Sequence, residues 1–89
     1  MTTPPFAWNA TITVRAEASS VLDWLERSLR PEASREVPRA RAELVRGTGN
    51  AIELTIFARD SGAMRAALNT YLGWVHLALA TARAADRSG

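Results

Sequence analysis

The stretch from Asp60 to Trp74, D-S-G-A-M-R-A-A-L-N-T-Y-L-G-W, decides the fold because it begins a long helix with a wide apolar side. Asp60 or Ser61 can cap the free N–H groups of the first turn. At 100° per residue the apolar side chains share an arc of roughly 160°, wider than the ~100° needed to rest on one core. They are Met64, Ala67, Leu68, Tyr71, Leu72, Trp74, Val75, Ala78, Leu79 and Ala82.

The expected helix, from about Ser61 to Ala85, is longer than any sheet that this chain can form. At 1.5 Å per residue it measures on the order of 37 Å, whereas a seven-residue strand reaches about 23 Å. We therefore expect a helix from another protein beside it. Side chains near the centre of the arc (Leu68, Val75, Leu79) should serve folding, and those toward its flank (Tyr71, Trp74) should serve the partner. The predicted partner-binding set is Trp24, Leu68, Tyr71, Leu72, Trp74, Val75 and Ala78.

The preceding sequence predicts three strands and one more helix. Residues 10–16 alternate apolar and polar, which is typical of a strand covered on one face. Ser20 and Asp23 have capping-box spacing before a leucine-rich helix that Pro31 should end. Residues 39–46 and 52–58 predict two strands joined at Arg46-Gly-Thr-Gly-Asn50, a tight-hairpin sequence. The order β-α-β-β-α predicts an α+β fold with two helices on one face of a three-stranded antiparallel sheet.

Composition limits the class of protein. The 89 residues suit one domain, expected over residues 10–85 between an N-terminal extension (1–9) and a C-terminal tail (86–89). There is no cysteine, hence no thiolate metal site or cysteine nucleophile. No apolar run is long enough to span a membrane, and the first residues do not resemble a signal peptide. We expect a cytoplasmic protein without cofactor or metal.

The arginines and the open side of the sheet are two further candidate sites. All eleven basic residues are arginine and the formal net charge is only +2, so the arrangement of the arginines matters more than their number. Arg39 and Arg41 should share the outer sheet face with Arg15. The candidate RNA-binding residues are Arg15, Arg35, Arg39 and Arg41, although the same charges could simply protect a strand edge. An unpaired strand edge and an uncovered face predict a homodimer formed through the sheet, with Thr11, Thr13, Val45, Thr55 and Phe57 on that face.

The residues from Ala10 to Ala84 resemble a known family. The specific segments are Leu29-Arg-Pro-Glu32, Ala58-Arg-Asp60 and Arg65-Ala-Ala-Leu-Asn-Thr-Tyr-Leu72 with Trp74. In this order and at these separations they resemble the small dimerisation subunit (Pcc family) of KEOPS, the archaeal and eukaryotic complex that makes threonylcarbamoyl-adenosine in transfer RNA. Two positions depart from the family pattern: Met64 replaces a leucine, and Gly73 replaces a basic residue.

The resemblance implies a non-catalytic subunit. Such a protein dimerises, docks by its helices on the sugar-kinase-fold ATPase subunit and contributes to the surface that holds tRNA. One alternative is a paralogous partner that forms a heterodimer with this subunit. A second is a stand-alone RNA-binding module, for which Phe57 is the one clear stacking candidate.

An enzyme is the least favoured alternative. His76 falls on the polar strip of the long helix with no second histidine in the chain. The Gly47-Thr-Gly49 sequence lies in the expected hairpin rather than at the start of a helix, so it does not predict a dinucleotide site. We therefore expect no catalytic residue.

Overall fold

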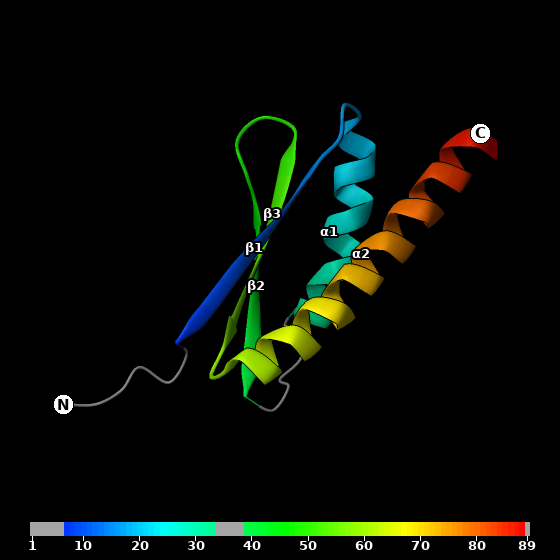
Figure 1. Cartoon of the computed structure of the whole chain (residues 1–89). Coiled ribbons are helices and arrows are strands. Elements are labelled where there is room, and N and C mark those ends of the chain that lie inside the picture. Colours follow the sequence, from blue (N-terminus) through cyan, green and yellow to red (C-terminus); the bar gives the residue numbers. More distant parts are fainter. Residues whose placement is uncertain (1–6, 34–38, 89) are drawn as a thin grey trace.

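The computed structural model describes residues 7–33 and 39–88, which form a sheet with two helices on one face (Figure 1). The order β-α-β-β-α and the α+β class confirm the prediction from sequence. The molecule is elongated, with extents of 55 × 24 × 17 Å. The elements are β1 (Trp8–Arg15), α1 (Ser19–Ala33), β2 (Ala40–Arg46), β3 (Ala51–Ala58) and α2 (Ser61–Ser88).

The sheet has β3 at its centre and β1 and β2 at its two edges, and all pairing is antiparallel. At the hairpin between β2 and β3, the Gly47 N–H donates to the Ala51 carbonyl at 3.0 Å. Gly49 has a φ of +69°, a backbone conformation that glycine adopts without steric cost. The predicted hairpin is therefore present, and each edge strand leaves one side of its backbone outside the sheet.

The core lies between the sheet and the helices. On β3 the inward side chains Ile52, Leu54, Ile56 and Ala58 are all buried, as the alternating pattern predicts. The inward side chains of β1 (Ala10, Ile12, Val14) are only partly buried. The two helices thus cover the middle of the sheet more fully than its β1 edge.

Helix α1 differs from its prediction at both ends. It begins at Ser19, where the Val21 N–H donates to the Ala18 carbonyl at 3.1 Å. The Asp23 carboxylate, which we expected in a capping box, pairs instead with Arg46 at the end of β2. Pro31 does not end the helix, because it lies in the last turn and only two residues follow it. A proline there removes one terminal hydrogen bond rather than breaking a long helix.

Helix α2 has 28 residues and is about 42 Å long, so it extends beyond the sheet as expected. Asp60 caps it, accepting the Ala63 N–H at 2.8 Å. Part of the expected excess is covered from within the chain, because α1 runs alongside α2 (Figure 1). Ala78 and Ala82 are buried at this helix pair.

Candidate protein-docking site

A cleft follows the seam between α1 and α2 on the side away from the sheet core. One part, of about 320 Å³, is bounded by Trp24, Ser28, Leu29 and Glu32 of α1 and by Trp74, Leu77, Ala78 and Thr81 of α2. A second part, of about 240 Å³, lies between Ser20, Val21 and Trp24 and the C-terminal turns of α2 at Ala82 and Ala85. Trp24 borders both parts of the cleft, so its indole ring lies between two adjoining hollows.

The side chains at the rim of this cleft are large, apolar and exposed. Trp24 is 41% exposed and Leu77 is 65% exposed, whereas Trp74 is half-buried. The Trp74 ring meets the Tyr71 ring edge to face, with 5.2 Å between centroids and 82° between planes. A fixed aromatic side chain beside a hollow is a common anchor of protein interfaces. The cleft can therefore receive an apolar partner helix.

Burial along α2 corrects the predicted division between folding and partner residues. Tyr71 is 2% exposed, and its hydroxyl donates a long hydrogen bond of 3.5 Å to the Glu32 carbonyl. Val75 and Ala78 are also buried, while Leu68 and Leu79 are only partly buried. The buried stripe is centred nearer Tyr71 and Ala78 than expected, because α1 packs on that side of α2. Tyr71 is thus a core residue of the free chain.

Two leucines on α2 mark opposite sides of the helix. Leu72 is 48% exposed, and at 100° per residue it lies about 160° around the axis from Trp74. It faces away from the cleft, although we expected it at the docking site. Leu77 lies three residues after Trp74, on the same side, and the apolar arc did not include it. Leu77 could have been found from the sequence, because a leucine about one turn after Trp74 lies on the same side of the helix. His76 is exposed on the polar side, as expected.

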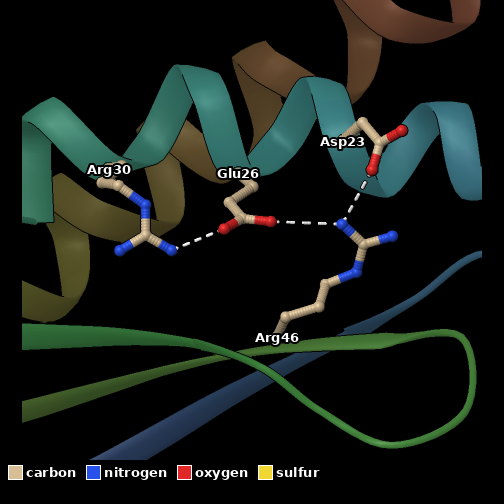
Figure 2. A network of polar contacts seen from close by, with 4 residues as sticks. All are labelled: Asp23, Glu26, Arg30 and Arg46. Carbon is tan, nitrogen blue, oxygen red and sulfur yellow. Dashed lines mark hydrogen bonds and ion pairs between the residues drawn. The ribbon is translucent and has the colours of Figure 1, made fainter.

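An ion-pair network fixes the other flank of α1 to the sheet (Figure 2). Arg46, at the end of β2, contacts Asp23 at 2.9 Å and Glu26 at 3.2 Å through the same guanidinium nitrogen. Glu26 also accepts a hydrogen bond of 2.6 Å from Arg30, one turn later on α1. Because Trp24 is on the opposite flank of α1, this network holds the helix from the side that faces away from the cleft.

Hydrogen bonds within this network shift the pKa values of Glu26 and Arg46. Hydrogen bonds from Arg30 and then from Arg46 lower the pKa of Glu26 below its ordinary value. The pKa of Arg46 is raised, chiefly by its hydrogen bond to Asp23. Both shifts favour the charged forms of Glu26 and Arg46, and we interpret the network as structural.

The candidate RNA-binding arginines do not form one patch. Arg15 lies opposite Ala51 and Arg41 opposite Phe57, six residues along β3, so the two are roughly 20 Å apart. Arg39 has a φ of +67° and its side chain pairs with Asp60, at the start of α2. The Arg41 guanidinium lies 5.0 Å from the centre of the Phe57 ring and 3.5 Å from Glu43. Arg35 lies outside the described residues.

The residues predicted for dimerisation lie together on the open face of the sheet. Thr11 and Thr55 are neighbours on β1 and β3, with their hydroxyl oxygens 3.0 Å apart. Thr13 is exposed and Val45 is 58% exposed, whereas Phe57 is partly covered. Arg15, Arg41, Glu43 and Glu53 surround them, so the face as a whole is polar.

No helix in the described part of the chain is long and apolar enough to cross a membrane.

The chain matches a known protein family. The family model described as transcription factor Pcc1 matches residues 9–83, which include β1 from its second residue on, all of α1, β2 and β3, and most of α2. No curated protein matches the chain.

Proposed function

Because the chain belongs to the Pcc1 family, a family of KEOPS subunits, we propose that it is a non-catalytic dimerisation and scaffold subunit of that complex. In this role it docks through its helices on the ATPase subunit, which performs threonylcarbamoyl transfer, and it helps to hold tRNA as part of the assembly. It works as a homodimer in the cytoplasm. A heterodimer with a paralogous chain is the alternative closest to this role.

The cleft between α1 and α2 is the observation that carries the docking proposal. Its rim presents Trp24 and Leu77 to solvent and holds Trp74 against Tyr71. An isolated domain gains nothing from exposing these side chains, whereas a partner helix would bury them. Tryptophan is among the residue types that contribute most to protein interfaces. We therefore propose that the ATPase subunit binds in this cleft and that Leu72 takes no part in the contact.

RNA contact is a secondary part of the proposal. The arginines on the open face are separated, and Phe57 lies under Arg41 rather than free to stack on a base. This arrangement disfavours the stand-alone RNA-binding module. In an assembly, separated arginines can each meet a phosphate of one extended RNA, and their contributions add.

The test of docking compares exposed leucines on two sides of one helix. Leu77→Ala and Trp24→Ala should weaken binding of the ATPase subunit at least tenfold, since losing a central interface side chain costs ~2 kcal/mol or more. Leu72→Ala is the matched control and should bind as wild type. Isothermal titration calorimetry with the purified subunit from the same organism measures both. Equal effects of Leu72→Ala and Leu77→Ala would refute the assignment of the cleft.

Activity provides the second measurement. The isolated chain should hydrolyse no ATP and transfer no threonylcarbamoyl group, but adding it should stimulate the rest of the complex. His76→Ala should leave this stimulation unchanged, because His76 is exposed on the polar side of α2. A hundredfold loss without unfolding would show that the histidine has a chemical role and that the protein is not only a scaffold.

A further inference from the structure

The docking cleft between α1 and α2 contains a single charge in its described wall. Among the described residues that bound its two parts, Glu32 is the only one with a charged side chain, and the others are apolar or neutral. Glu32 lies in the last turn of α1, one turn after Ser28, and it is half-buried. Its carboxylate therefore marks the end of the cleft that is nearest to the C-terminus of α1.

The neutral polar side chains of the cleft make little demand on a partner. The Thr81 hydroxyl donates to the Leu77 carbonyl at 2.9 Å, so this hydrogen bond is made within α2. A serine on a helix, such as Ser28, can bond to the backbone of its own preceding turn in the same way. Glu32 differs from both because it carries a full charge.

The end of α1 adds to the negative potential around Glu32. The last turn of a helix exposes carbonyl groups and carries a partial negative charge. Arg30, the basic residue of this turn, forms an ion pair of 2.6 Å with Glu26 on the flank of α1 that faces away from the cleft. The helix end and the carboxylate thus place two sources of negative potential at one end of the cleft.

A partner that covers this cleft would remove water from the carboxylate. One of its oxygens, Oε2, is already shielded from solvent. Burying a carboxylate is unfavourable unless hydrogen bonds and an opposite charge replace the lost water. Because a carboxylate has about four acceptor sites, it can take donors from a partner in addition to any contacts within its own chain. A wholly apolar partner helix would therefore bind poorly at this end of the cleft.

We infer that the docking helix of the ATPase subunit carries an arginine or a lysine that pairs with Glu32, and that this pair fixes the register of the helix in the cleft. The inference rests on the proposed docking and specifies its chemistry. Apolar contacts with Trp24 and Leu77 are not directional, so they allow more than one register. A single polar or charged contact between packed helices selects one register among them. Glu32 thus determines specificity, while Trp24 and Leu77 supply affinity.

Neutralising Glu32 tests the inference from the side of this chain. Glu32→Gln keeps the size of the side chain and should weaken binding of the purified ATPase subunit at least tenfold in calorimetry, because the partner's cation is left without its counter-charge. Ser28→Ala, one turn away in the same cleft, is the matched control and should change the affinity by less than about threefold. Circular dichroism checks that both variants are folded.

The outcomes separate this inference from the docking proposal. If Trp24→Ala and Leu77→Ala weaken binding but Glu32→Gln does not, the inference is overturned and docking in the cleft stands. If none of these variants changes the affinity, the docking proposal itself fails.

Variants of the partner decide the matter even if Glu32 variants do not fold. Hydrogen exchange identifies the helices of the ATPase subunit that this chain protects, and each lysine or arginine on them is replaced in turn by glutamine. One replacement should weaken binding of the wild-type chain at least tenfold. Glutamate at that same position should restore binding to Glu32→Arg, which a purely structural role of Glu32 would not allow. If every basic residue can be replaced without effect, Glu32 has no cationic partner and the inference is wrong.

Discussion

Replacing Tyr71 tests whether the aromatic pair on α2 belongs to the core or to a docking surface. Tyr71 is 2% exposed and its ring meets Trp74 edge to face. Removing a buried aromatic ring typically costs about 3–5 kcal/mol. A chain of 89 residues has a total stability of about 4–13 kcal/mol. Tyr71→Ala should therefore remove a large part of the stability and leave a substantial unfolded population.

Two companion variants separate the possible causes. Tyr71→Phe keeps the ring and removes the hydroxyl that donates to the Glu32 carbonyl at 3.5 Å, so it should cost less than about 1 kcal/mol. Leu77→Ala removes an exposed side chain and should change stability by less than about 0.5 kcal/mol. Urea unfolding followed by circular dichroism measures all three, repeated at several protein concentrations because self-association raises apparent stability. If Tyr71→Ala were within 1 kcal/mol of wild type, our assignment of Tyr71 to the core would be wrong.

Three further predictions concern single features of the helices. Gly73→Ala should stabilise the chain by about 0.5–1 kcal/mol in thermal unfolding, because an added Cβ meets no atom within 4 Å and alanine is the better helix former; a loss of stability would contradict this. Asp60→Ala should cost about 1 kcal/mol through loss of the helix cap, and Asp60→Asn, which can still accept the Ala63 N–H, should recover most of it. The folded state holds the pKa of Glu26 below its ordinary value, so Glu26 contributes stability at neutral pH that is lost as the pH falls below about 4.3. Glu26→Gln should accordingly make stability fall less steeply as the pH is lowered through this range. An unaltered acid limb of the stability–pH profile would show that the ion pairs of Glu26 with Arg30 and Arg46 contribute nothing.

Most of the fold follows from local sequence patterns. Strict alternation identified the buried residues of β3, and Gly47 and Gly49 located the hairpin. The helix α1 was less predictable at its ends because its capping depends on distant residues. Asp23 forms its contact with Arg46, which is 23 residues away in the sequence. A proline two residues before a helix end is tolerated, and its position alone does not reveal where that end is.

The docking cleft was only partly predictable, because a helical projection does not say where a neighbouring helix lies. The sequence selected Trp24 and Trp74, which border the same cleft. The sequence also led us to expect Tyr71 and Leu72 at the partner-binding surface. The wide apolar arc gave no reason to prefer one side of the helix to the other. The position of α1 against Ala78 and Ala82 settles which flank is covered. The separation between Arg15 and Arg41 was unpredictable for a similar reason, because spacing along two different strands does not fix the distance between their residues.

The three tryptophans lie in three different environments. Trp8 lies at the β1 edge, Trp24 on the exposed side of α1, and Trp74 on α2 against Tyr71. Indole emission moves to shorter wavelength when water is removed from the ring. Variants that retain a single tryptophan would let one spectrometer follow the sheet edge at Trp8 and the proposed docking cleft at Trp24 separately, without any attached dye. The order in which the assembly forms could then be read from which emission band shifts first.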